Sequence, residues 1–137
     1  MITSEFAILN VNFLNIATSP NSFITGSSSI YLEGGGNDNI TVSSSTQNSI
    51  TLADFTSGSN ATINGLNPND FTLKFSDATI GSGHELVVTA SPNSANNATT
   101  TISLPGYSTA DVTSGKLTVA SETSPATGAP YLLIHAS

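Results

Sequence analysis

The feature that most constrains this fold is a series of short runs in which apolar, mostly β-branched or aromatic residues alternate with polar ones. This period of two is the period at which successive side chains of a β-strand point to opposite faces of a sheet. Turn-forming groups at 34–37 (GGGN), 67–70 (NPND) and 81–83 (GSG) separate the runs. No stretch shows the three- and four-residue apolar spacing of an amphipathic helix over three turns. The sequence therefore predicts an all-β fold.

About ten strands are expected in a chain of 137 residues, which is the length of one domain. Such a number of short strands is typical of a single-domain sandwich or of a short solenoid, a β-roll-like stack. We expect an N-terminal strand within 1–18 and the remaining strands within an all-β domain at 19–137. The expected strands are Glu5–Thr18, Ser28–Leu32, Asn39–Ser43, Ser49–Ala53, Ala61–Asn64, Phe71–Phe75, Glu85–Ala90, Thr99–Leu104, Lys116–Ala120 and Tyr131–His135.

A weak repeat bears on the choice between these architectures. Ile30, Ile40 and Ile50 are ten residues apart, and Ile63 follows after thirteen. Spacing on the scale of one strand plus one turn is typical of stacked solenoid coils. It is equally compatible with consecutive hairpins of a meander, so both interpretations stay open.

The N-terminal strand is the most apolar part of the chain. It is expected to be one long strand, which is either an ordinary core strand or a strand donated to a neighbouring subunit. A flat apolar edge readily pairs with a strand of another chain. The predicted assembly interface consists of Phe6, Ile8, Leu9, Val11, Phe13, Leu14 and Ile16.

Composition excludes several classes of partner. Ser, Thr and Asn supply 22, 19 and 14 residues, and charged residues only 8%. The net charge is −7, with two lysines and no arginine, so we expect no nucleic-acid binding. No apolar run reaches the roughly 20 residues that span a bilayer, so no membrane span is expected. The absence of Cys excludes disulfides, and the hydroxyl- and amide-rich composition favours an extracellular protein.

Catalysis is not expected. Only His84 and His135 could act as the base of a nucleophilic site, and neither belongs to a known catalytic motif. The P-loop and the zinc-protease motif H-E-x-x-H are also missing. We therefore predict that the protein is not an enzyme.

The nonapeptide Glu33–Thr41 (EGGGNDNIT) resembles the calcium-binding repeat G-G-x-G-x-D-x-U-x of the RTX proteins, which type I systems secrete from bacteria. Only Glu33 departs from that pattern. The resemblance implies Ca²⁺ held by Glu33, Gly34, Gly36 and Asp38, since carbonyl and carboxylate oxygens are the ligands that calcium prefers. In RTX proteins the ion lies between successive turns, whereas this chain has one good copy of the repeat. A glycine-rich hairpin loop is the alternative.

A second, looser resemblance concerns the C-terminal region. Type I-secreted proteins often end in a β-rich region that is similar in order to 101–106 (TISLPG), then Asp111, then 131–134 (YLLI). Met1 to Phe6 lacks the features of a cleavable signal peptide, which agrees with an export signal at the C-terminus.

These observations favour a structural protein that assembles with copies of itself into a filament, a surface layer or a biofilm matrix, stabilised by calcium. Low charge density permits close strand–strand contact between subunits. The alternative is a carbohydrate-binding or adhesive β-sandwich module. Support for glycan binding is thin because the chain has no Trp and three Tyr.

Overall fold

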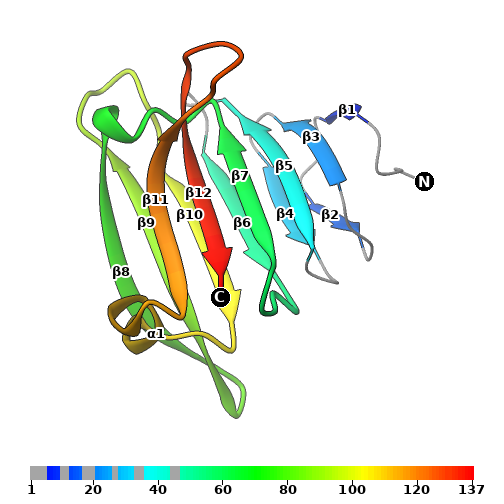
Figure 1. Ribbon diagram of the computed structural model, residues 1–137, viewed down its shortest axis with the longest axis vertical. Coiled ribbons are helices and arrows are strands. Elements are labelled where there is room, and N and C mark those ends of the chain that lie inside the picture. The colour runs from blue at the N-terminus through cyan, green and yellow to red at the C-terminus, as the bar shows by residue number, and fades with distance from the viewer. Residues whose placement is uncertain (1–5, 10–12, 17–20, 26–27, 33–35, 44–46) are drawn as a thin grey trace.

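The computed structural model describes residues 6–9, 13–16, 21–25, 28–32, 36–43 and 47–137. It confirms an all-β fold built from two facing sheets (Figure 1). The first sheet runs in the order β1-β3-β5-β7-β12-β11, and the second in the order β2-β4-β6-β10-β9-β8. The strands are β1 (Phe6–Leu9), β2 (Phe13–Ile16), β3 (Asn21–Thr25), β4 (Ser28–Leu32), β5 (Asn37–Val42), β6 (Asn48–Leu52), β7 (Asn60–Asn64), β8 (Phe71–Ile80), β9 (Gly83–Pro92), β10 (Thr100–Pro105), β11 (Leu117–Thr123) and β12 (Pro130–Ala136).

The first seven strands form a solenoid, because each consecutive strand lies in the opposite sheet. Strands β1, β3, β5 and β7 pair in parallel, as do β2, β4 and β6. The ten-residue isoleucine spacing is therefore one step from sheet to sheet. Ile30 lies beside Ile50 in the second sheet, and Ile40 lies beside Ile63 in the first. Of the two interpretations of the repeat, the solenoid is correct for this half of the chain.

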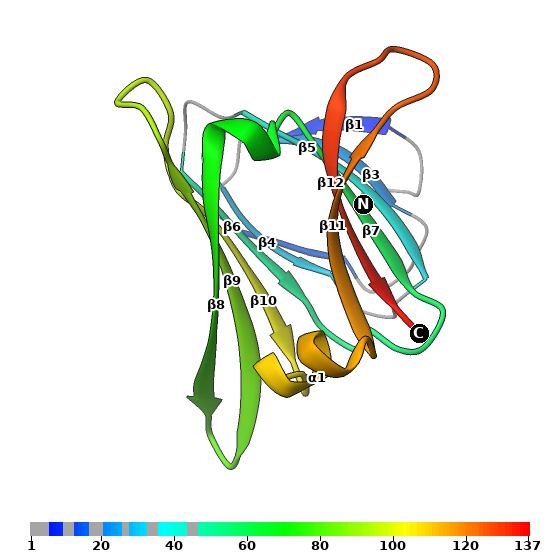
Figure 2. The same cartoon turned by 60° about the vertical axis from the view of Figure 1, so that its left-hand side comes forward.

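The C-terminal half closes the stack with antiparallel strands. Strand β10 continues the second sheet in parallel with β6, and then β9 and β8 add as an antiparallel hairpin. In the first sheet β12 and β11 add to β7 in the same antiparallel way. A 3₁₀ turn, η1 (Pro68–Asp70), and one short helix, α1 (Thr109–Ser114), lie at the two ends of the gap between β8 and β11 (Figure 2).

The core lies between the sheets and consists of the inward side chain of every second residue. In the second sheet Ile50, Ile102 and Val88 lie in register and are fully buried. In the first sheet Ile40, Ile63 and Leu132 form the matching row. Burying this many aliphatic side chains is the main stabilising contribution, at about 1.5–3 kcal/mol for each.

The expectation of one long N-terminal strand is wrong. The segment Glu5–Thr18 contains two short strands, β1 and β2, which belong to different sheets and pair with β3 and β4 respectively. Apolar residues on both faces of the segment suggested a single buried strand. In a two-sheet coil the same composition serves two strands that each contribute to a shared core. Strand β3 and helix α1 were not expected from the sequence.

Candidate functional site

The predicted calcium segment is partly described. Glu33 and Gly34 lie outside the described residues, and Gly36 directly precedes β5 with a φ of +83°. The carbonyl oxygen of Gly36 accepts a hydrogen bond of 2.7 Å from the N–H of Asn60 on the next coil. One of the carbonyl oxygens expected to hold calcium is thus bonded to the backbone.

A buried serine joins the Gly36 turn to the turn that follows one coil later. Ser59 is 2% exposed, and its hydroxyl oxygen accepts hydrogen bonds from the N–H groups of Gly36, at 2.9 Å, and of Thr56, at 3.2 Å. Two N–H groups therefore point their positive ends at the Ser59 hydroxyl. A calcium ion requires the reverse arrangement, in which several oxygen atoms point their negative ends at one position. Sequence reasoning did not identify Ser59, because it lies 23 positions from Gly36.

Asp38 lies in β5 and occupies the same face as Ile40, so its side chain is turned inward at the rim of the sheet. It is 5% exposed and lies in register with Asn21 of β3 and Ala61 of β7. Among the residues that the structure describes, no cluster of three or more His, Cys, Asp or Glu side chains could hold a metal ion. Calcium binding at this segment remains a prediction.

The predicted assembly residues lie at one end of the solenoid. Phe6, Ile8 and Leu9 belong to β1, the outermost strand of the first sheet, while Phe13, Leu14 and Ile16 belong to β2, the outermost strand of the second. Val11 lies outside the described residues. Among the described strands, nothing pairs with the outer edge of β1 or of β2. We call these two edges the N-terminal end.

The pairing register shows which rows these residues belong to. Phe6 lies in the row of Ser22 and Asn39, and Ile8 lies in the row of Ile24 and Thr41. Asn39 and Thr41 are on the outer face of β5. The residues that alternate with them on the inner face are buried: Asp38, Ile40 and Val42. On the second sheet Phe13 lies in the row of Ser29 and Ser49, and Ser49 is exposed. Rows that are polar farther along the solenoid therefore become apolar at its N-terminal end.

Asparagine side chains bond to one another across the outer face of the first sheet. The Asn60 amide donates to Asn37 Oδ1 at 2.9 Å, and the Asn64 amide donates to Asn39 Oδ1 at 2.6 Å. His135 Nδ1 lies 2.7 Å from Asn60 Oδ1. Because the Asn60 amide nitrogen is committed to Asn37, its oxygen accepts from the ring and Nδ1 carries a proton. These bonds stabilise the stacking of coils; the alternating Asn37 and Asn39 were a signal that the sequence analysis did not use.

The two histidines do not form a catalytic arrangement in the described part of the chain. His135 bonds to Asn60, and His84 is exposed near the turn between β8 and β9. Neither ring makes a hydrogen bond to a Ser or Thr hydroxyl of a described residue. That the protein has no enzymatic activity remains a prediction.

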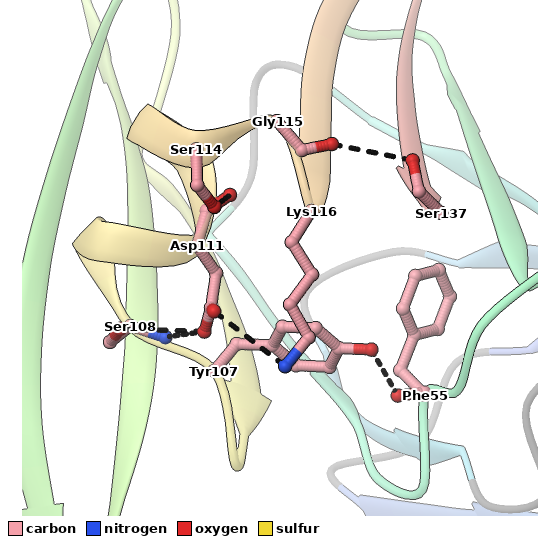
Figure 3. Close-up of polar contacts among 8 residues, drawn as sticks. All are labelled: Phe55, Tyr107, Ser108, Asp111, Ser114, Gly115, Lys116 and Ser137. Atoms are coloured by element: carbon pink, nitrogen blue, oxygen red, sulfur yellow. Dashed lines mark hydrogen bonds and ion pairs between the residues drawn. The ribbon is translucent and has the colours of Figure 1, made fainter.

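A polar and aromatic cluster lies beside α1 (Figure 3). The Tyr107 ring meets Phe55 edge-on, with centroids 6.4 Å apart, and its hydroxyl donates to the Phe55 carbonyl at 2.6 Å. Lys116 Nζ lies 5.7 Å from the centre of the Tyr107 ring and 3.7 Å from an oxygen of Asp111. Burial, together with the nearby Asp111 carboxylate, raises the pKa of Tyr107 above its ordinary value of 10.0. A phenol held neutral in this way acts as a structural hydrogen-bond donor.

The three tyrosines do not share a surface. Tyr107 is buried, Tyr31 is on the outer face of β4, and Tyr131 is on the outer face of β12 in the other sheet. A sugar-stacking platform needs exposed rings on one face, so this arrangement does not favour the carbohydrate-binding alternative.

No protein-family model matches the chain, and no curated protein or solved structure matches it. Within the described ranges, the structure contains no helix with the length and apolar character needed to cross a membrane.

Proposed function

We propose that the protein is a structural subunit that joins other β-structure through the N-terminal end of its solenoid. The observation that carries the proposal is the position of β1 and β2: each is the last described strand of its sheet, and both lie at the same end of the stack. A sheet edge presents a row of unpaired N–H and C=O groups, which is a template for pairing with another chain. Two such edges side by side provide twice the template.

The sequence of these edge strands supports the proposal. Strand β1 reads FAIL and β2 reads FLNI, with no charged residue and no proline in either. Natural proteins that keep a sheet edge solvated usually protect it with lysine, proline, a bulge or a covering segment. The apolar composition of both strands supports the proposal further, because burying apolar surface favours association.

The setting that we propose is extracellular, as the composition suggests. An uncharged hydroxyl- and amide-rich surface without cysteine suits a matrix or surface-layer component, and a calcium ion at the Glu33–Thr41 segment would stiffen the stack next to its joining end. A carbohydrate-binding or adhesive role has weaker support, because the tyrosines lie apart.

The proposal is tested by placing charge on the joining edges. Ile8→Lys/Phe13→Lys changes one outer-row position on each edge strand and leaves the core rows intact. A matched control, Ser94→Lys/Ala95→Lys, adds the same charge to the exposed loop between β9 and β10. In light scattering coupled to gel filtration, the wild type and the control should assemble while the edge variant runs as a monomer. A wild type that stays monomeric at every concentration contradicts the proposal.

Truncation is a poorer test than charge. Removing residues 1–18 takes away the first coil and leaves β3 and β4 as the new edges. These strands read NSFIT and SSIYL, which are also uncharged, so the shortened chain would keep a sheet edge of the same kind.

A further inference from the structure

We infer that Asn64 is a site of slow, spontaneous deamidation, and that Asn39 on the neighbouring coil restrains the reaction. The inference concerns the joint between β5 and β7 and is independent of the proposed function. Asn64 and Gly65 form the only Asn-Gly pair of the chain, which contains no Asp-Gly pair. An asparagine followed by glycine is the pair most open to this reaction, because glycine has no side chain to hinder attack by its backbone nitrogen.

The fold requires glycine at position 65. Gly65 has a φ of +83°, in the left-handed region that residues with a Cβ rarely adopt. A Cβ at this position would collide with the carbonyl oxygen of Val42. No bulkier residue can therefore follow Asn64 to shield its side chain. The reactive pair is a consequence of the tight bend that ends β7.

The reaction needs only this pair and water. The backbone nitrogen of Gly65 attacks the side-chain carbon Cγ of Asn64, and the bond from Cγ to the amide nitrogen breaks. Ammonia leaves with the proton that the Gly65 nitrogen gives up, and a five-membered succinimide ring remains. Water then opens the ring at either carbonyl, which gives aspartate or isoaspartate. One water molecule is consumed for each ammonia released.

Two hydrogen bonds hold the Asn64 amide in place. Its nitrogen donates to Asn39 Oδ1 at 2.6 Å and lies 3.3 Å from the carbonyl oxygen of Ile40, which can only accept. Both partners belong to β5, which lies beside β7 in the first sheet (Figure 1). These bonds keep the leaving amide on the neighbouring coil and away from the Gly65 nitrogen.

The backbone of Asn64 adds a second restraint. Asn64 is the last residue of β7 and pairs in register with Thr41. In an extended strand the nitrogen of the next residue is rotated away from the side chain, so the ring cannot close. The end of β7 must therefore open locally before the reaction proceeds. Strand ends open more readily than the core of a fold, so the rate at Asn64 is low but measurable.

Deamidation would weaken the joint between the two coils. A carboxylate at position 64 has no hydrogen to donate at neutral pH, so Asn39 Oδ1 and the Ile40 carbonyl lose their donor. The new negative charge would also face the Ile40 carbonyl oxygen. Isoaspartate would lengthen the main chain by one carbon and disturb the pairing of Asn64 with Thr41. The modification thus exchanges a bond between coils for a repulsion.

Peptide mapping by mass spectrometry tests the site in the wild-type chain. The full-length protein is incubated at neutral pH, both in buffer and unfolded in urea. Asn64 should react before every other asparagine, and at least about tenfold more slowly in the folded chain than in urea, since reaction there waits for local opening. Asn60 is the internal reference, because it lies in the same strand and is followed by Ala61.

Each other outcome of the mapping contradicts part of the inference. The site is wrong if Asn60 reacts as fast as Asn64 in urea. It is also wrong if the folded chain has no product at Asn64 once the unfolded chain is fully converted. Equal rates at Asn64 in the folded and unfolded chains overturn the restraint by the fold.

The role of Asn39 is tested by removing its side chain. Asn39→Ala should speed deamidation of Asn64 in the folded protein by roughly threefold to tenfold, the factor by which one hydrogen bond of ordinary strength opposes opening. Asn37→Ala is the matched control, because it removes the equivalent bond from Asn60 on the same two strands. It should leave the rate at Asn64 nearly unchanged. Equal acceleration by both variants, or none by Asn39→Ala, overturns the role of Asn39.

Asn64→Asp reproduces the aspartate product and tests its effect on the fold. We expect this variant to unfold at a lower temperature than the wild type. Asn96→Asp adds the same charge to the exposed loop between β9 and β10 and should unfold at the wild-type temperature. An Asn64→Asp variant as stable as Asn96→Asp overturns the weakening of the joint, whatever the rate of the reaction.

Discussion

The hydroxyl of Tyr107 donates a hydrogen bond to the backbone carbonyl of Phe55 across 52 positions of sequence, at 2.6 Å. The bond ties the segment after β10 to the segment after β6, two strands that are themselves parallel neighbours. It therefore fastens the last coil of the solenoid to the strands that close it.

Tyr107→Phe should destabilise the protein by about 1–2 kcal/mol. The substitution keeps the ring contact with Phe55 and removes only the donor, which leaves a buried carbonyl without its partner. Urea unfolding followed by circular dichroism gives the free energy of unfolding. Tyr131→Phe is the matched control, since the Tyr131 hydroxyl makes no hydrogen bond to a described residue; equal effects of the two changes would contradict the role given to Tyr107.

Ser59→Ala should cost about 2 kcal/mol of unfolding free energy. The hydroxyl satisfies the N–H groups of Gly36 and Thr56, and an unsatisfied buried donor costs about 1–3 kcal/mol. Ser57→Ala, two positions away and exposed, should change the unfolding free energy by less than about 0.5 kcal/mol. A small effect of Ser59→Ala would mean that water replaces the hydroxyl between the two turns.

The attachment of α1 to β8 should weaken in acid. The N–H and then the hydroxyl of Thr109 lower the pKa of Asp77 below its ordinary value of 3.8. Because the folded pKa lies below the unfolded one, the carboxylate stabilises the fold above the unfolded value, and this contribution is lost as the pH falls through the folded pKa.

The unfolding free energies of the wild type and of Asp77→Asn should therefore differ at neutral pH and converge in acid. Thermal or urea unfolding at a series of pH values measures the difference. Glu122→Gln is the control for a simple loss of charge at an exposed position. A difference that stays constant down to acid pH would contradict this prediction. It would show that a protonated Asp77 side chain holds Thr109 as well as the carboxylate does.

Calcium should raise the unfolding temperature of the wild type if the Glu33–Thr41 segment binds it. A ligand present at about 100 times its dissociation constant adds about 2.7 kcal/mol to stability. Differential scanning fluorimetry with calcium, magnesium or a chelator provides the measurement, and Asp38→Asn should abolish the response. An identical response of Asp38→Asn and the wild type would place any bound ion elsewhere, and no response of the wild type would contradict the calcium prediction.

Much of the strand pattern was predictable, because the alternation of apolar and polar residues is a local property. Ser28–Leu32 was placed correctly, and nine further expected strands overlap observed ones. The long segment Glu5–Thr18 was placed wrongly in one respect: alternation identifies the two faces of a strand, but it does not show where the chain passes from one sheet to the other. Helix α1 was missed because six residues are too few to show a helical period.

The candidate site was less predictable. Glu33, Gly34, Gly36 and Asp38 were selected by a local motif, and the contact that joins the Gly36 turn to the next coil comes from Ser59, which the motif does not contain. The apolar residues at the N-terminal end were found because they are consecutive in sequence. Their arrangement as two edges at one end depends on pairing with β3 and β4.

The sequence by itself determined that this chain forms strands with one apolar and one polar face, since a period of two leaves the backbone no other way to bury Ile30, Ile40, Ile50 and Ile63. It also determined that both edge strands of the N-terminal end are uncharged. Only the tertiary structure decided that successive strands alternate between two sheets, that Asn60 lies beside Asn37, and that Tyr107 meets Phe55. These neighbours are 23 and 52 positions apart, and contacts between distant residues are set by how the whole set of strands packs.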